Sequence, residues 1–187
     1  TGKTTLLKMI IGEKEPAQGH ITLGSRVHIG YFAQEHTELH SHLTVLEELM
    51  ADYTMNEGQA RSLLGRFLFR GDDVFTPVDS LSGGEQARLA LLKLLLSGPN
   101  FLILDEPTNH LDIPTREILE DALLDFGGTY LIVSHDRYFL DKITTRTLSL
   151  ENKQVKDFAG NYSYYKEKEA ELLALQAEKK GFENTVR

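Results

Sequence analysis

The spacing of apolar residues along the chain separates segments with helical periodicity from short runs that are continuously apolar. Apolar positions three and four residues apart predict helices over residues 4–11, 45–53, 57–69, 83–96 and 114–126. Short β-rich runs predict strands over residues 21–23, 27–32, 101–104, 130–133, 147–151 and 154–158. The runs 101–104 and 130–133 have no polar interruption, which is typical of parallel strands buried on both faces.

Residues at the ends of these segments support several of the boundaries. Thr44 and Asn56 are suited to cap the helices that begin at residues 45 and 57. Gly12 stands where the first helix is expected to stop. Gly24-Ser25, between the first two β-rich runs, predicts that these runs form a hairpin.

The order of these elements predicts an α/β fold in which a mainly parallel core sheet is accompanied by a small antiparallel β segment and a lateral α-helical subdomain. We expect the helical subdomain over about residues 35–80, inside one domain that covers residues 1–160. A short helix is expected over residues 136–142. Residues 161–187 are expected to form a charged extension with a helix from about 166 to 180, typical of a solvated or partner-facing surface.

The composition excludes several classes of protein. A net charge of −8 over 187 residues argues against a broad basic surface for nucleic acid, so any RNA contact would be local. The absence of cysteine excludes disulfides and thiolate metal sites, which is compatible with a cytoplasmic location. No apolar run reaches the roughly 18 to 20 residues of a membrane-spanning helix, so we expect no membrane insertion.

The first five residues carry candidate phosphate-binding chemistry. Thr1-Gly2-Lys3-Thr4-Thr5 matches the end of the phosphate-loop pattern G-x-x-x-x-G-K-[ST], whose first four positions are not present. We therefore expect the chain to be a fragment of a longer polypeptide, truncated inside this loop. The backbone N–H groups of Gly2 to Thr5 would bind phosphate, Lys3 would contact the β- and γ-phosphates, and the Thr4 hydroxyl would bind Mg²⁺. Taken alone, the segment is also compatible with an ordinary helix start.

Two predicted strands end in polar residues. Asp105 and Glu106 follow the strand 101–104, and His135 follows the strand 130–133. Because parallel α/β sheets bind ligands at the C-terminal ends of their strands, these three side chains are expected to converge. Asp105 would bind Mg²⁺ directly or through water, Glu106 would orient and polarise the attacking water, and His135 would contact the γ-phosphate or that water. The structural alternative is an acidic turn after a strand.

A polar segment follows the predicted strand 27–32. Gln34 lies between that strand and the helical subdomain, so we expect it to contact Mg²⁺ or the water and to report the nucleotide state to the subdomain. His36, His40 and His42 lie nearby without strong supporting ligands. We therefore interpret these histidines as part of a solvated loop rather than a metal site.

The sequence LSGGEQ at residues 81–86 opens the predicted helix 83–96. Ser82 and Glu85 fit a capping box, in which each side chain bonds the backbone N–H of the other residue. Gly83 and Gly84 add bare backbone that a phosphate can approach at the positive end of a helix. Capping and phosphate binding are compatible functions of this turn.

Together these motifs resemble those of the ATP-binding cassette (ABC) ATPase family, over residues 1 to about 158. The matching segments are the end of Walker A (residues 2–5), the Q-loop (Gln34), the signature (81–86), Walker B (101–106), the D-loop (Leu111-Asp112) and the switch histidine (His135). The resemblance implies a P-loop NTPase that hydrolyses ATP with Mg²⁺, with Asp112 among the nucleotide-binding residues. It also implies that nucleotide is bound between two cassettes. Ser82 and Gly84 would then serve the ATP of a partner cassette, and the fragment alone would hydrolyse little.

Two further segments resemble the ABC-F subfamily. These are residues 106–112, EPTNHLD, and residues 134–140, SHDRYFL. The resemblance implies a soluble protein with two cassettes in one chain that acts on the ribosome, with rRNA or tRNA nearby, in translation or antibiotic resistance. Residues 30–36, GYFAQEH, and the short helical segment before the signature favour the second cassette, whereas a helix after Gly160 favours the first; we favour the second. The residue that contacts adenine would precede residue 1.

Two other functions stay open at the level of sequence. The cytosolic cassette of a membrane transporter catalyses the same reaction with similar motifs, so the chain also resembles such a cassette. A transporter cassette would dock a membrane partner through the helical subdomain. A degenerate cassette would bind ATP without hydrolysing it, but the presence of Glu106 and His135 argues against this. A second cassette in the full-length sequence would favour ABC-F, and membrane-spanning segments would favour a transporter.

Overall fold

The computed structural model describes residues 2–33, 39–109, 111–151 and 154–185. The chain forms two compact units, a larger one over residues 2–135 and a smaller one over residues 136–187. The predicted division into a domain at 1–160 and an extension at 161–187 stays a prediction.

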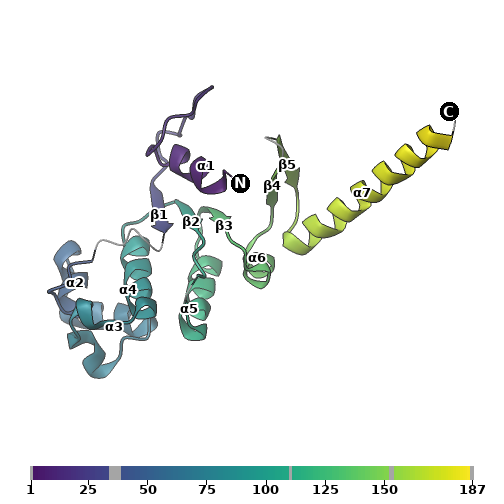
Figure 1. Cartoon of the computed structure of the whole chain (residues 1–187). Coiled ribbons are helices and arrows are strands. Elements are labelled where there is room, and N and C mark those ends of the chain that lie inside the picture. Colours follow the sequence, from purple (N-terminus) through teal and green to yellow (C-terminus); the bar gives the residue numbers. More distant parts are fainter. Residues whose placement is uncertain (1, 34–38, 110, 152–153, 186–187) are drawn as a thin grey trace. The chain divides into compact units, whose positions relative to one another are not determined.

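A parallel sheet of three strands forms the centre of the larger unit (Figure 1). Its strands, in spatial order, are β1 (Ile29–Ala33), β2 (Phe101–Asp105) and β3 (Thr129–Val133). Ala33, Asp105 and Val133 are in register across the sheet. The residues that follow β2 and β3 therefore leave the sheet at the same edge, which is where a ligand site is expected.

Burial differs between the two strands that were predicted to be buried on both faces. In β2, Leu102, Ile103 and Leu104 are all 0% exposed, as predicted. In β3, residues 130–133 are only half-buried, so the prediction of full burial is wrong for this strand. The difference follows from the strand order, because β2 has a neighbour on each side whereas β3 pairs with β2 alone among the described strands.

The predicted hairpin over residues 21–32 is also wrong. Residues 21–23 form no strand, and β1 begins only at Ile29 and pairs in parallel with β2. Ile21 and Leu23 are 41% and 45% exposed, and β propensity without a packed neighbour does not hold a strand in place. The antiparallel segment is instead β4 (Thr147–Glu151) paired with β5 (Gln154–Phe158) in the smaller unit.

Most predicted helices of the larger unit are confirmed, with small shifts at their ends. They are α1 (Lys3–Ile10), α2 (Val45–Asp52), α3 (Glu57–Arg66), α4 (Gly83–Leu96) and α5 (Ile113–Leu124), with two short 3₁₀ turns, η1 (Gly71–Phe75) and η2 (Val78–Ser80), between α3 and α4. Thr44 and Asn56 form capping boxes at α2 and α3 as predicted. Gly12 has a φ of 84° and follows the end of α1. The helix α3 stops before residue 69 because Leu68 has a φ of 64°, outside the right-handed helical region.

Packing around α4 connects the sheet to the helical subdomain. In Figure 1, α4 and α5 run side by side, and α4 also contacts β1 and α3. A Cβ atom at Gly30 of β1 would lie 3.0 Å from side-chain atoms of Leu94, Pro99 and Leu102, so glycine allows α4 to approach the sheet closely. Contacts among α2, α3 and η1 complete the helical subdomain that the sequence predicts.

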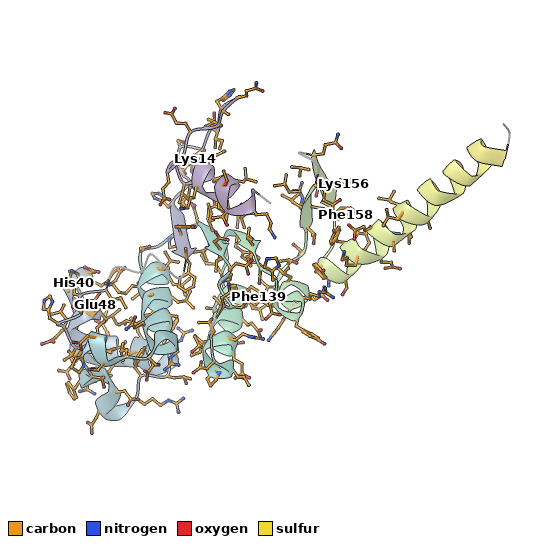
Figure 2. All side chains as sticks on the ribbon, in the orientation of Figure 1. Lys14, His40, Glu48, Phe139, Lys156 and Phe158 are labelled. Carbon is orange, nitrogen blue, oxygen red and sulfur yellow. The ribbon has the colours of Figure 1, made fainter. Side chains whose placement is uncertain are left out.

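The smaller unit contains α6 (Arg137–Ile143), the β4-β5 pair and α7 (Tyr162–Thr185). Figure 2 labels two of its buried side chains, Phe139 of α6 and Phe158 of β5. The backbone N–H of Ser163 donates to Asp141 Oδ1 at 2.6 Å, which fixes the start of α7 against α6. The helix α7 therefore begins about one turn earlier than predicted. No helix in the described part of the chain is long and apolar enough to cross a membrane.

Candidate functional site

Glu106 follows β2 directly and has an uncommon backbone conformation. Its φ is 50°, which costs a residue other than glycine about 1–3 kcal/mol. Its backbone N–H donates to the carbonyl oxygen of Val133 at 2.7 Å, and its own carbonyl oxygen accepts from Asn109 at 3.1 Å. Bonds on both sides thus hold a strained turn at the edge of the sheet, where strain often accompanies function.

The carboxylate of Glu106 contacts His135 at two points. The backbone N–H of His135 donates to Oε2 at 3.1 Å, and the ring Nε2 lies 3.5 Å from Oε1. The Glu106 side chain is 23% exposed and that of His135 is 83% exposed. A partly buried carboxylate is therefore paired with an imidazole that faces solvent, and the structure brings these two predicted residues together.

A second link joins the same two loops. The hydroxyl oxygens of Thr108 and Ser134 lie 3.3 Å apart, and Thr108 is buried. The turn after β2 and the turn after β3 are thus connected through side chains as well as backbone. Thr108 lies within the EPTNHLD segment but was not among the residues predicted to act at the site.

Asp105, the last residue of β2, fits a role as a metal ligand. Its Oδ1 atom is buried and accepts no hydrogen bond from the residues that the structure describes. Buried carboxylate oxygens are normally satisfied, and Mg²⁺ binds through one or two carboxylates together with substrate phosphates. Burial raises the pKa of Tyr31 in β1, and the negative charge of Asp105 raises it further.

The start of α1 is open to a ligand. Gly2, with a φ of 84°, precedes the helix, and its first turn contains Lys3, Thr4 and Thr5 without an acidic residue. Gly2 and Thr4 are exposed, and Lys3 and Thr5 are half-buried. The unpaired N–H groups of such a turn favour anions. The helix contacts β2, but among the described residues no hydrogen bond or ion pair joins Lys3 or Thr4 to Asp105.

Gln34 and His36 lie outside the described residues, so the role expected of Gln34 stays a prediction. His40 and His42 lie in the segment before α2, with their ring centroids 6.2 Å apart. The His40 side chain is 55% exposed, and its Nδ1 atom lies 3.0 Å from Oε2 of Glu48. His40 is therefore partly solvated and also bound to a carboxylate of the helical subdomain.

The signature turn at the start of α4 has the predicted capping box. The Ser82 N–H and hydroxyl donate to Glu85 Oε2 at 2.8 and 2.6 Å, and the Glu85 N–H donates back to the Ser82 hydroxyl at 3.3 Å. Hydrogen bonds from the Ser82 side chain and backbone hold the pKa of Glu85 below its usual value. Ser82 and Gly83 are exposed, and a Cβ atom added at Gly83 would meet nothing within 4 Å. The turn is thus pre-formed and its outer surface is open.

Gly84 faces inward, toward the start of α5. A Cβ atom at Gly84 would lie 3.4 Å from Thr115 Oγ1 and 3.6 Å from Asp112 Oδ2. Asp112 caps α5, since its Oδ1 atom accepts from the Thr115 N–H at 2.9 Å. Hydrogen bonds from Thr115, and then the charge of Arg88, hold the pKa of Asp112 below its usual value. The structure therefore brings the signature turn and Asp112 together as a second cluster.

Arg88 belongs to this cluster and was missed by the sequence reasoning. Its side chain is only 9% exposed, and its Nη1 atom donates to Thr115 Oγ1 at 2.9 Å. A usable signal was its position four residues after Gly84, which places the two residues on one face of α4. Because Gly84 is the part of the signature that faces α5, an arginine on the same face was a candidate to reach α5 as well.

These features define an ATP-binding cassette, and the chain belongs to the ABC transporter family, whose model matches residues 1–109. Among curated proteins, the chain is 54% identical to YdiF of Bacillus subtilis, an ATP-binding protein by name, over 94% of the chain. It is 43% identical to ABC transporter F family member 5 of Arabidopsis thaliana over 95% of the chain. It is 42% identical to the energy-dependent translational throttle protein EttA of Escherichia coli over 94% of the chain. These relatives confirm the predicted resemblance to the F branch.

The chain spans only between 26% and 33% of the length of these relatives. Among solved structures, it is similar to a dimeric ATP-binding cassette in a post-hydrolysis state with ADP and phosphate bound. The TM-score is 0.62 and the identity 25%, over 84% of this chain and 80% of the other. The predicted cassette fold is therefore confirmed.

Proposed function

We propose that this chain is one ATP-hydrolysing cassette of a longer ABC-F protein, and that it acts as half of a nucleotide-driven clamp in translation. The observation that carries the proposal is the strained turn at Glu106, whose carboxylate is held against His135 at the edge of the sheet. Such a carboxylate is suited to orient and deprotonate a water molecule, as general bases do. The reaction is ATP plus water to ADP plus phosphate.

Each cluster then has a defined part in the reaction. Lys3 and the N–H groups of residues 2–5 bind the β- and γ-phosphates, Glu106 accepts the proton of the attacking water, and His135 contacts the γ-phosphate or that water. Asp105, Thr4 and Gln34 would hold Mg²⁺, which, when bound, neutralises charge on the phosphate oxygens. The bare, buried Oδ1 atom of Asp105 supports this assignment.

The second cluster serves a different nucleotide in this proposal. Ser82 and Gly83 are exposed, and the Asp112 side chain is 58% exposed. We assign Ser82, Gly83, Gly84 and Asp112 to the ATP bound by a second cassette, either in the same full-length chain or in a dimer partner. The dimeric state of the similar cassette supports this arrangement. The chain by itself would accordingly hydrolyse ATP weakly.

The biological partner is proposed from the relatives. One of them, EttA, is named as a translational throttle. The resemblance to ABC-F therefore supports a cytoplasmic protein that acts on the ribosome, near rRNA or tRNA, with antibiotic resistance as a narrower variant of the same activity. Residues 30–36 and the short helical subdomain support an assignment to the second cassette of such a protein.

Replacing Glu106 by glutamine tests the chemistry in the full-length protein. Glu106→Gln keeps the size of the side chain but removes the base, so hydrolysis should fall by at least ~100-fold while ATP binding is retained. Glu57→Gln, the same change at an exposed carboxylate of α3, is the matched control and should leave turnover unchanged. Wild-type turnover in the Glu106→Gln protein would remove Glu106 from the proposed role.

The shared site is tested by Ser82→Arg. This change fills the open face of the signature turn, so it should block ATP-dependent closure of the two cassettes while sparing nucleotide binding at this chain's own phosphate loop. Equilibrium binding of a fluorescent ATP analogue and closure measured by cross-linking separate the two effects. Loss of nucleotide binding at this chain's own loop would contradict the two-cassette assignment.

The partner is tested by co-sedimentation with ribosomes. The Glu106→Gln protein, held in its ATP-bound state, should sediment with ribosomes in ATP and be released in ADP. Failure to sediment with ribosomes, together with binding to a membrane-embedded partner, would instead support the alternative function as a transporter cassette. In that case the assignment to translation falls while the assignment as an ATPase stands.

A further inference from the structure

Arg88 is a buried cation with an unusual set of partners. Besides Thr115, its guanidinium lies 3.8 Å from Glu85 Oε1 and 4.0 Å from Asp112 Oδ2, and its central carbon lies 5.4 Å from the centre of the Phe69 ring. Its Nε atom is buried and has no acceptor among the described residues. Both carboxylates are therefore at the outer limit of an ion pair, and one donor is unsatisfied.

This environment is poor for stability, because a buried arginine is favourable only when its charge and its donors are well satisfied. It is, however, well suited to setting the relative position of three elements. The planar fork of the guanidinium lies near Glu85, which bonds the capping residue of α4, and also contacts the first turn of α5 and an aromatic ring of the helical subdomain. A lysine ammonium, which is a point charge, does not reproduce such a set of contacts.

Gly84 provides a second and independent observation. The same two residues that Arg88 approaches in α5, Asp112 and Thr115, are those that a Cβ atom at Gly84 would meet. The start of α4 thus packs at Gly84 against the side chains of Asp112 and Thr115 at the start of α5, and Arg88 lies one helical turn further along α4. Thr115 is itself 2% exposed, so this contact is part of the core.

From these contacts we infer that Arg88 is a positioning residue that holds the signature turn and Asp112 as one rigid surface for the nucleotide of the partner cassette. Arg88 does not touch nucleotide in this role. It acts by fixing the distance between the α4 and α5 caps, so that Ser82, Gly84 and Asp112 meet the same ATP together. The inference rests on the proposed function of the signature turn.

The test compares two substitutions at this contact in the full-length protein. Arg88→Met removes the fork but keeps an apolar stem of similar length, and Thr115→Val removes only the hydroxyl that Arg88 contacts. Each should lower kcat per folded molecule by between about 10- and 100-fold, the scale of a small misplacement of reacting groups. Nucleotide affinity at this chain's own phosphate loop, measured with a fluorescent ATP analogue, should stay within about threefold, because Arg88 lies in a different cluster.

Two further variants define the mechanism. Arg88→Lys keeps the charge, so recovery of wild-type kcat by lysine would show that charge alone matters and would overturn the role of the planar fork. The double variant Arg88→Met with Thr115→Val should lose no more activity than the worse single variant, since both remove one contact. Multiplying losses would mean that the two residues act independently, which also overturns the inference.

Arg61→Met is the matched control. Like Arg88, Arg61 lies near a carboxylate and an aromatic ring: Glu57 Oε1 is 2.8 Å away, and the centre of the Phe75 ring is 4.8 Å from its central guanidinium carbon. Unlike Arg88, it lies on α3, and its side chain is 35% exposed. Its kcat should equal that of the wild type. Unchanged kcat per folded molecule in Arg88→Met and Thr115→Val, even with a lower melting temperature, would reduce Arg88 to a structural role. Closure of the two cassettes, measured by cross-linking, distinguishes the two failures. If neither the wild type nor Arg61→Met shows ATP-dependent closure, the proposed function is wrong, whatever the role of Arg88.

Discussion

A buried charge cluster joins α2 to α4, and we predict that breaking it strongly destabilises the fold. The side chain of Glu48 is 0% exposed and that of Lys93 is 12% exposed, and the Lys93 ammonium bonds Glu48 Oε1 and, at 2.8 Å, Asp52. Glu48 Oε2 accepts from His40, which lies beside it in Figure 2. Burial by itself lowers the pKa of Lys93, but hydrogen bonds to Asp52 and Glu48 outweigh it and raise the pKa.

Lys93→Met should therefore be severely destabilising. It leaves Glu48 Oε1 buried without its cation, and removing one partner of a buried ion pair costs about 3–5 kcal/mol. Natural domains are stable by only about 5–15 kcal/mol, so this is a large fraction of the total. Replacing both residues, Glu48→Met with Lys93→Met, should recover most of the loss, because an apolar pair leaves no buried charge unpaired.

Amide hydrogen exchange followed by mass spectrometry measures this loss locally, without requiring two-state unfolding of a long protein. In peptides that cover α2 and α4, Lys93→Met should accelerate exchange by more than ~100-fold, since each 1.4 kcal/mol is a factor of ten. Lys168→Met is the control, because Lys168 pairs with Glu171 at 2.7 Å on the exposed surface of α7. Such a pair contributes at most about 1 kcal/mol, or roughly fivefold in local exchange. An effect of Lys93→Met no larger than that of the control would show that the buried pair of Lys93 and Glu48 does not stabilise this packing.

Two other predictions concern the signature cap and the packing of α4. The pKa of Glu85 is lowered in the folded protein, so its stabilising contribution is present above the ordinary pKa of a glutamate in the unfolded chain and is lost as the pH falls through the lower folded value. The melting-temperature difference between wild type and Glu85→Gln should thus be largest near neutral pH and shrink below about pH 4; a difference that grows on acidification would contradict the assignment. Gly30→Ala should destabilise the protein by about 1–3 kcal/mol through overpacking against α4. Gly65→Ala, in α3 with open space around it, should instead stabilise by up to about 1 kcal/mol, and urea denaturation that finds the same sign for both would be inconsistent with this packing.

β propensity alone did not predict the strand arrangement near residues 21–32, because strand formation there depends on pairing with a remote strand. The segment 21–23 is apolar enough to predict a strand, but its side chains stay exposed and it pairs with nothing in the described part of the chain. From the next run, 27–32, only residues from Ile29 onward form a strand, and this strand pairs in parallel with β2, where Ile29 lies opposite Phe101. Pairing of this kind depends on burial by remote neighbours, so local pattern cannot select between a hairpin and a parallel strand.

Helix caps were predicted correctly at three positions for the opposite reason. Capping at Thr44, Asn56 and Ser82 involves bonds to a residue only three positions away, so the pattern and the contact are both local. The juxtaposition of Glu106 and His135 was also predictable, because each follows a strand of one parallel sheet. The left-handed conformation of Glu106 was not predictable, since it depends on the bond from its N–H to Val133 in the neighbouring strand.

The family resemblance and the helix caps could be predicted from short motifs, because the physics of such motifs acts within about one helical turn. How the motifs are joined depends on contacts between residues far apart in the chain. Arg88 meets Thr115 across 27 positions and Lys93 meets Glu48 across 45. Neither pair follows a local rule, and a buried charge finds its partners only once the surrounding helices have packed.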